Sequence, residues 1–256
     1  MTLIGSVRVN DKPYLASAPL TLPKVEALFG TTPRTASTKA GVAEIDAAYG
    51  GSKLVRLFWS GTAGQSPVTD RPVVGSFKTM SEATAPWAKT MWRWAYQHEI
   101  DSKIKKGQCT LAQWQADMAT LVALDIDGLS VILTADCFAN TGKKPTDYLM
   151  RGVTHLGVDF DGISQSSGYH DYSRELVAVE SFAKAYGLTW GVAEFGANRA
   201  ANDPSGVVRA AWLTDWVGRF VSAGAEYVCL WEFASQAGSE FTTDAEVAAV
   251  RALLNK

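Results

Sequence analysis

The stretch Met91-Trp-Arg-Trp-Ala-Tyr-Gln-His-Glu99 decides the fold, because an apolar and aromatic run ends there abruptly in an imidazole and a carboxylate. Such a run predicts a buried strand whose last residues emerge at the edge of a sheet. A second stretch, Thr189-Trp-Gly-Val-Ala-Glu-Phe-Gly196, repeats the design with a carboxylate near the end of an apolar strand. We therefore expect Glu99 and Glu194 to face each other across a cleft.

Eight strand-like runs alternate with helical or irregular segments along the chain. The runs cover residues 3–9, 53–59, 72–77, 91–99, 129–134, 155–160, 189–194 and 225–231. Helices are expected at 39–49, 110–124, 146–151, 173–186, 204–223 and 244–254, whereas 10–38 and 60–71 read as irregular. This alternation predicts an α/β fold, a single (β/α)8 TIM barrel whose second and third units are short or irregular.

The spacing of the two carboxylates agrees with such a barrel. Dividing 256 residues by eight gives 32 per unit, and 194 − 99 = 95 is close to three units. Glu99 would then end strand four and Glu194 strand seven. A complete barrel needs roughly 250 residues, and no break in composition indicates a linker, so residues 1–256 are expected to form one domain.

Helix faces and ends can also be predicted. A stripe on 110–124 faces inward, and Thr110 with Gln113 forms a capping box. Helix 173–186 should stop at Gly187, helix 204–223 at Gly224, and the last helix should be capped by Thr242 or Thr243. The expected inward residues are Leu111, Trp114, Met118, Leu121 and Val122 on the first helix, Leu176, Val179, Phe182, Ala183 and Tyr186 on the second, and Val208, Trp212, Trp216 and Phe220 on the third.

Composition excludes several classes of partner. The chain has 24 basic and 26 acidic residues, a formal charge of −2, which gives no electrostatic basis for binding nucleic acid or an anionic membrane. No apolar run approaches the roughly 20 residues of a membrane span, and the N-terminus does not resemble a signal peptide. We expect a soluble monomer, either secreted after loss of a signal or part of a larger phage or cell-surface protein.

The three cysteines are widely spaced and form no CxxC motif, so neither a disulfide framework nor a zinc site is indicated. Cys137 and Cys229 lie in apolar runs and are expected to be buried thiols. His98-Glu99 does not extend to HExxH because position 102 is Ser. GxSxG, P-loop and GxGxxG motifs are absent as well. No cofactor or metal is predicted.

Two carboxylates at the C-terminal ends of barrel strands fit the hydrolysis of a glycosidic bond. In such barrels the reactive face is the C-terminal end of the strands. One carboxylic acid protonates the leaving oxygen, and the other attacks the anomeric carbon or activates water. Taken alone, a Glu at a strand end is more often a solvated or salt-bridged group, so the argument depends on the pair and its spacing.

Trp94-Ala-Tyr-Gln-His-Glu99 resembles the strand-four motif of the clan of retaining glycoside hydrolases with (β/α)8 barrels. Its His-Glu ending is most like glycoside hydrolase family 26, the β-mannanases and their relatives. Gly191-Val-Ala-Glu-Phe-Gly196 is similar to that family's strand-seven motif, and His155-Leu-Gly-Val-Asp159 to its strand-six segment. The sequence departs from the family at Ile100-Asp101-Ser102, where Met-Asn-Gly is common in mannanases, which leaves the sugar specificity open.

The resemblance implies an endo-acting, retaining glycosidase that degrades a polysaccharide or oligosaccharide. Glu99 would be the general acid/base and Glu194 the nucleophile, while His98 would hydrogen-bond the nucleophile and a sugar hydroxyl. Retention requires carboxyl groups about 5–5.5 Å apart, and a separation near 6.5–9.5 Å would favour inversion.

Other residues are candidates for binding substrate. Arg56 alternates with Leu57 on the second run and could reach the mouth of the barrel, or form a salt bridge inside it. Trp59 and Trp231 end runs two and eight and are the best stacking platforms for a sugar. Tyr169 follows strand six, with His170 and Asp171, in a loop rich in Ser and Gly. Asp159 and Asp161 could orient neighbours by hydrogen bonds, although structural roles are more common for such residues.

A second class of function fits the same features. A barrel without catalytic activity could bind carbohydrate or serve a structural role, for example in a phage tail or a cell-wall assembly. Loss of hydrolysis with retained glycan binding in variants of Glu99 and Glu194 would favour the enzyme, and binding without turnover by the natural chain would favour the alternative.

Overall fold

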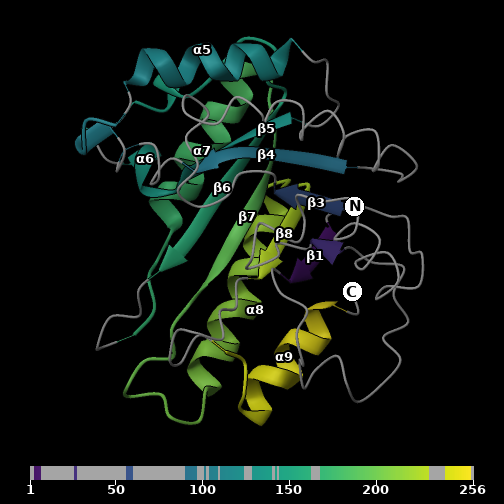
Figure 1. The fold of residues 1–256 in the computed structure, drawn as a ribbon. Helices are drawn as coiled ribbons and strands as arrows, with labels where there is room; N and C mark the ends of the chain where they lie inside the picture. Colours follow the sequence, from purple (N-terminus) through teal and green to yellow (C-terminus); the bar gives the residue numbers. More distant parts are fainter. Residues whose placement is uncertain are drawn as a thin grey trace, which may run out of the picture.

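Eight parallel strands form one sheet in the part of the chain that the structure describes (Figure 1). The computed structural model describes residues 3–6, 26–27, 56–59, 90–96, 101, 104–108, 110–123, 129–139, 142, 144–162, 168–230 and 240–254. The sheet order is β1-β8-β7-β6-β5-β4-β3-β2. The strands are β1 (Leu3–Ser6), β2 (Glu26–Ala27), β3 (Arg56–Trp59), β4 (Thr90–Tyr96), β5 (Leu129–Thr134), β6 (His155–Gly162), β7 (Thr189–Ala197) and β8 (Tyr227–Leu230).

The two strands that end this order, β1 and β2, approach each other, with Cα atoms closer than 8 Å. Each neighbouring pair in the order is parallel, and parallel sheets of this kind occur almost only in α/β proteins. The predicted α/β class and the alternation of strands with helices are therefore confirmed.

The assignment of the second and third strands was wrong. The second strand is the two-residue β2, which lies inside the segment expected to be irregular. The run at 53–59 is the third strand, β3, and it pairs directly with β4, Arg56 lying opposite Thr90. The strand expected at 72–77 lies outside the described residues, as does the helix expected at 39–49. The ranks of β4 and β7 are unchanged, which preserves the three-unit spacing.

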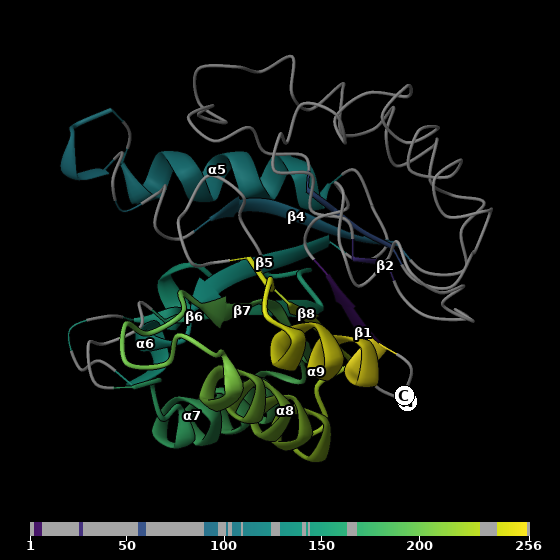
Figure 2. The same ribbon diagram turned by 90° about the horizontal axis from the view of Figure 1, so that it is seen from below.

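The long helices pack around the outer face of the curved sheet, since their buried side chains form one hydrophobic cluster with those of β5 to β8. In Figure 2, α5 (Leu111–Val122) lies on one side of the strands beside β4, and α7 (Ser173–Tyr186), α8 (Val207–Ser222) and α9 (Asp244–Leu254) lie on the other. Two short helices, α6 (Asp136–Ala139) and the 3-10 helix Pro145–Asp147, lie between β5 and β6. The latter occupies part of the helix expected at 146–151. In the described residues no helix is long and apolar enough to cross a membrane.

The predicted helix ends are largely confirmed. The backbone N–H of Thr110 donates to the side-chain oxygen of Gln113 at 2.8 Å, and the N–H of Gln113 donates back to the Thr110 hydroxyl at 3.2 Å. Thr243 and Glu246 make the same reciprocal pair at the start of α9. Gly187 ends α7 with φ of 63°, a left-handed conformation that favours glycine.

The core between sheet and helices contains most of the predicted inward residues. Trp114, Met118, Leu176, Val179, Ala183, Trp216 and Phe220 are all buried. Tyr186 and Val208 are corrections, because they are 50% and 56% exposed. On α8 the buried residues are Arg209, Ala210, Leu213, Trp216, Val217 and Phe220. A strict four-residue spacing drifts around a helix of 3.6 residues per turn, so the core face begins at 209 and not at 208.

The opposite face of the sheet is packed by small residues next to large ones. A Cβ atom on Gly191 would lie 2.3 Å from the ring of Tyr227, and one on Gly157 would lie 2.7 Å from the Ile132 side chain. Glycine is therefore required where these strands bring large side chains across the inner face. Cys137 and Cys229 are buried free thiols, as predicted, and Cys109 lies outside the described residues.

Candidate active site

A one-residue bulge in β7 determines where Glu194 lies. Val192 belongs to the core against the helices, and so does Phe195, whose ring centroid is 4.6 Å from that of Trp212 on α8. In a regular strand, side chains alternate between faces, and three residues apart they would lie on opposite ones. The register with β6 shifts between these positions, so β7 holds one extra residue there. Ala193 and Glu194 are therefore both directed to the inner face.

The same kind of irregularity occurs in β4. Arg93 pairs with Ser130 and Tyr96 pairs with Ile132, so three steps along β4 match two steps along β5. Bulges are common beside active sites, where they redirect a side chain. The two strands expected to position Glu99 and Glu194 thus both carry a register irregularity of one residue.

Three polar residues form one layer across β5, β6 and β7 on the inner face. Thr134 pairs with Asp159, and Asp159 pairs with Glu194 in the parallel register. All three are buried, with exposed fractions of 3%, 1% and 8%. The Thr134 hydroxyl also donates to Asp136 at the start of α6. Buried polar groups are costly unless they are paired, so a polar layer here at the C-terminal ends of the strands marks a candidate site.

The other half of the expected site lies where the structure gives no description. Glu99 and His98 follow the end of β4, and Trp231 follows the end of β8, all three outside the described residues. For β3 the backbone alone is described: Trp59 is its last residue and Arg56 its first. Trp59 therefore lies at the C-terminal edge of the sheet and Arg56 at the other end of the strand. Their roles in binding substrate stay predictions.

Tyr169 lies half-buried in the loop before α7, where its contacts are with protein. Its ring stacks on Trp212 with centroids 5.2 Å apart, and its hydroxyl donates to Asp203 at 2.9 Å. The backbone N–H of Ala200 donates to the same hydroxyl at 3.2 Å. Burial, followed by the hydrogen bond to Asp203, raises the pKa of Tyr169 to about 12, so the hydroxyl remains a donor at neutral pH. A role in binding substrate stays a prediction.

The neighbours of Tyr169 stabilise the start of α7. Asp171 accepts hydrogen bonds from the backbone N–H and the hydroxyl of Ser173, and these bonds lower the pKa of its carboxyl. The His170 ring lies 3.7 Å from Glu175, and its carbonyl accepts a hydrogen bond from the Trp212 indole. Their place in the loop after β6 is confirmed, and the contacts described are those of a helix start.

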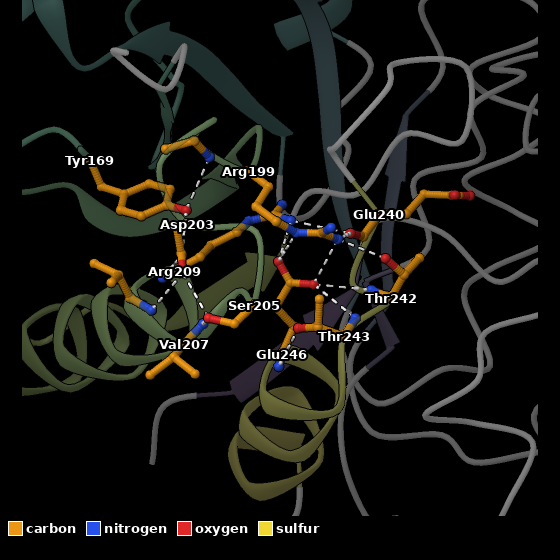
Figure 3. A network of polar contacts seen from close by, with 12 residues as sticks. Tyr169, Arg199, Asp203, Ser205, Val207, Arg209, Glu240, Thr242, Thr243 and Glu246 are labelled. Atoms are coloured by element: carbon orange, nitrogen blue, oxygen red, sulfur yellow. Dashed lines mark hydrogen bonds and ion pairs between the residues drawn. The ribbon is translucent and has the colours of Figure 1, made fainter. Parts of the chain in front are cut away.

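A buried polar network ties together the segments that follow β6, β7 and β8 (Figure 3). Arg199, two residues beyond β7, donates through Nε and Nη2 to the two carboxylate oxygens of Glu246, each at 3.0 Å. Arg209 donates to Glu246 at 3.0 Å as well, and both of these side chains are fully buried. Asp203 accepts the backbone N–H groups of Val208 and Arg209, together with the hydroxyl of Tyr169.

Asp101, two residues beyond the expected acid/base Glu99, is held by a hydrogen bond from another part of the chain. Asp101 accepts a hydrogen bond from the hydroxyl of Tyr148, which is buried and packs edge-on against Trp114. Burial, then the bond to Asp101, raises the pKa of Tyr148. The hydroxyl therefore stays protonated and holds Asp101 against the segment between β5 and β6.

His155 and His170 lie at opposite ends of the β6 unit, the first at the start of the strand and the second beyond its end. His155 faces Thr154 and Glu226, with its Nδ1 2.7 Å from the Thr154 hydroxyl. Within the described residues, no three His, Cys, Asp or Glu side chains are arranged to hold a metal ion.

Solved structures with the same arrangement of strands and helices were found by comparison. An endo-β-1,4-mannanase double mutant from Cellulomonas fimi superposes with a TM-score of 0.53 at 14% identity, over 84% of this chain and 57% of the mannanase. A family 5 xyloglucanase from Paenibacillus pabuli gives 0.54 at 9% identity, over 84% of this chain and 80% of the other. The fold is shared with glycoside hydrolases.

A further match covers both chains completely. The clostridial cellulose synthase subunit Z from Clostridioides difficile superposes with a TM-score of 0.55 at 10% identity. This chain spans little more than half the length of the mannanase, and identities of 9–14% establish the fold alone. No protein-family model and no curated protein matches the sequence.

Sequence reasoning found Glu194 and its strand but missed what orients it. The bulge gives no signal because every residue from Trp190 to Ala197 is buried, so no polar alternation marks the extra residue. Thr134 ends an apolar run and was not among the predicted site residues. Its register partner Asp159 was a candidate for orienting neighbours. The predicted cap at Thr242 or Thr243 marked one end of the network of Figure 3. Arg199 and Arg209, however, lie 47 and 37 residues before their partner Glu246.

Proposed function

We propose that this chain is an endo-acting glycoside hydrolase that cleaves a polysaccharide with retention of anomeric configuration. The observation that carries the proposal is the buried layer of Thr134, Asp159 and Glu194 at the C-terminal ends of β5–β7, into which the β7 bulge turns Glu194. The glycoside hydrolase fold of the neighbours supports the general class. We also propose that the eight strands close into a single (β/α)8 barrel over residues 1–256, since β1 and β2 approach each other.

The chemistry proceeds in two displacements. In the first, the Glu194 carboxylate attacks the anomeric carbon as the bond to the leaving oxygen breaks, and the Glu99 carboxylic acid protonates that oxygen. In the second, the Glu99 carboxylate removes a proton from water, the water oxygen bonds to the anomeric carbon, and the bond to Glu194 breaks. His98 orients the nucleophile and a sugar hydroxyl, and Trp59, Tyr169 and Trp231 contact the substrate. Arg56 begins β3 at the opposite end of the strand from Trp59 and has no part in this arrangement.

The substrate class can be narrowed by the structural neighbours. They include an endo-β-1,4-mannanase and a xyloglucanase, so the first substrates to test are soluble β-1,4-linked mannans and glucans with and without branches. An endo mode predicts that the viscosity of the polymer falls before appreciable reducing sugar accumulates. Release of single sugars from chain ends at constant viscosity would contradict it.

Azide rescue tests the roles of both carboxylates. Glu194→Ala should lose several orders of magnitude in kcat, and azide should restore turnover by forming a glycosyl azide of inverted configuration, because one displacement replaces two. Glu99→Ala with azide should give the retained configuration, because the covalent intermediate still forms. Glu180→Gln on α7 is the control and should retain full activity.

Two outcomes would overturn the assignment. Full activity of Glu194→Ala would remove the proposed nucleophile. Binding of glycans by the natural chain with no turnover on the whole panel would instead favour the carbohydrate-binding or structural barrel.

A further inference from the structure

We propose that Arg199 is a positioning residue for the active site, holding the segment that follows Glu194 against the start of α9. The inference rests on the proposed function, because it concerns the placement of the nucleophile's strand. Arg199 lies five residues after Glu194 and two residues after the last residue of β7. It is the first charged residue after the end of β7.

The contacts of Arg199 fix both ends of the connection in place. Nε and Nη2 bind the two oxygens of Glu246 at 3.0 Å each, and Nη2 also reaches the Thr242 hydroxyl at 2.6 Å. A bidentate pair of this kind fixes orientation as well as distance, because the planar fork of the guanidinium matches the carboxylate. The segment after β7 is therefore held against the start of α9 in a defined orientation.

Glu246 is the centre of the network and is fully buried. It accepts the backbone N–H groups of Thr242 and Thr243 at 3.1 Å each, as well as the two arginines. Burying charges costs solvation energy, so a buried ion pair is weak evidence for added stability. Such a pair can instead hold the chain in one conformation among several. Here it holds the segment after β7 in one orientation.

The network also reaches the segment after β6. Asp203 caps the start of α8 through the N–H groups of Val208 and Arg209, and it accepts the hydroxyl of Tyr169 at 2.9 Å. Figure 3 shows Tyr169, Asp203, Arg209, Glu246 and Arg199 in one continuous cluster. Three successive connections at the C-terminal edge of the sheet are thereby joined, and in parallel α/β folds these connections build the reactive face.

Arg199 can be separated experimentally from the structural part of the network. Arg209 is 0% exposed, and its removal would leave Glu246 buried with half of its cationic partners. Arg199 is 20% exposed at its side chain, and without it Glu246 keeps Arg209 and two backbone N–H groups. Arg199→Met should therefore fold, with a loosened connection after β7.

The experiment compares Arg199→Met and Arg199→Lys with Arg219→Met. Arg219 is the matched control, since it pairs with Asp215 within α8 and is 48% exposed. On the polysaccharide that the natural chain hydrolyses best, Arg199→Met should lose about tenfold or more in kcat, because misplacement by about 1 Å can cost up to a hundredfold. KM should change less than threefold, and Arg219→Met should keep the full rate.

Two further readouts distinguish positioning from a general effect. Amide hydrogen exchange in Arg199→Met should accelerate at 198–206 and 240–246 and remain unchanged in α7. Arg199→Lys should recover only part of the rate, because a single ammonium cannot reproduce the fork. Full recovery by Lys would show that charge alone matters and would overturn the proposal.

The proposal fails by itself if the natural chain hydrolyses polysaccharide and Arg199→Met does so equally fast. It also fails if kcat falls equally in Arg199→Met and Arg219→Met. Absence of hydrolysis by the natural chain would instead overturn the proposed function and this inference with it, so the two failures are distinguishable.

Discussion

Asp159 on β6 and Glu194 on β7 are partners in the parallel register, and the side chains of both are buried on the same face of the sheet. Neighbouring parallel strands lie about 4.8 Å apart, so the two carboxyl groups occupy one small region. The partnership depends on the bulge in β7: without the extra residue, Ala193 would lie opposite Asp159, and Glu194 would turn toward the helices.

Asp159→Asn should therefore impair catalysis although it preserves the shape of the side chain. We expect kcat to fall at least tenfold, about 1.4 kcal/mol in activation free energy, because the substitution removes an ionisable carboxyl group buried beside the proposed nucleophile. Initial rates on the best polysaccharide substrate measure the effect. Asp215→Asn on the exposed face of α8 is the control, and an Asp159→Asn variant as fast as the natural chain would contradict the prediction.

Gly191 is predicted to tolerate no side chain. A Cβ atom there would meet three ring atoms of Tyr227 at 2.3–2.7 Å, and Tyr227 is only 1% exposed, so the ring cannot move aside into solvent. Overpacking of this kind costs about 1–3 kcal/mol of the free energy of unfolding. Urea denaturation of Gly191→Ala measures the loss.

Gly218 provides the matched substitution for Gly191. It lies on the exposed side of α8, and a Cβ atom there would meet nothing within 4 Å. Gly218→Ala should raise the free energy of unfolding by about 0.5–1 kcal/mol, because alanine loses less backbone entropy in a helix. If both alanine variants changed stability in the same direction, the packing argument for Gly191 would be wrong.

The hydroxyl of Tyr148 is predicted to contribute to both stability and activity. Tyr148→Phe keeps the ring against Trp114 and removes the hydrogen bond to Asp101. We expect a loss of about 0.5–1.5 kcal/mol in the free energy of unfolding. Because Asp101 follows Glu99 by two residues, kcat should fall several-fold as well.

Two measurements on one sample test this prediction, the thermal unfolding midpoint and the initial rate. Tyr186→Phe is the control, since Tyr186 is 50% exposed and ends α7. A Tyr148→Phe variant with the same initial rate as the natural chain would show that the hydrogen bond to Asp101 has no influence on the site.

How much of this structure the sequence could predict differs from element to element, for physical reasons. The strands β4 to β8 were found because each is an apolar run of several residues between helical or turn-forming segments. The two-residue β2 has too few residues to show any pattern, and its pairing with β3 exists only in the folded sheet. Local pattern therefore placed Glu194 on its strand. It could not predict that Ile132, Gly157 and Ala193 lie together on the same inner face of the sheet as Glu194.

The site shows the same limit. Thr243 and Glu246 form a local pattern three residues apart, which the capping rule detects, whereas the pairing of Arg199 with Glu246 spans 47 residues and depends on the fold. On α8 the helical period of 3.6 residues decides whether Val208 or Arg209 faces the core. The charged Arg209 is buried and the apolar Val208 is exposed. A buried arginine whose partner carboxylate lies 37 residues away cannot be recognised before that partner is placed.

Acid should destabilise the protein through the same network. Burial acts to raise the pKa of Glu246, but hydrogen bonds from Arg199 and Thr243 and the charge of Arg209 outweigh it and hold the pKa below its usual value. Asp203 likewise has a lowered pKa, since the N–H groups of Arg209 and Val208 and the hydroxyl of Tyr169 outweigh its burial. A carboxyl with a depressed pKa in the folded state stabilises that state above the ordinary carboxyl pKa.

The sign of the effect follows from these directions. The contribution of Glu246 and Asp203 is complete at neutral pH, begins to decline as pH falls through the ordinary carboxyl range near pH 4, and is lost below the folded-state pKa values. The thermal unfolding midpoint should therefore fall between about pH 5 and pH 3. Glu246→Gln should have a lower midpoint than the natural chain at pH 7 and a shallower decline toward pH 3, because its side chain does not titrate. Asp215→Asn should follow the natural chain throughout, and a Glu246→Gln profile parallel to that of the natural chain would remove Glu246 as a source of acid sensitivity.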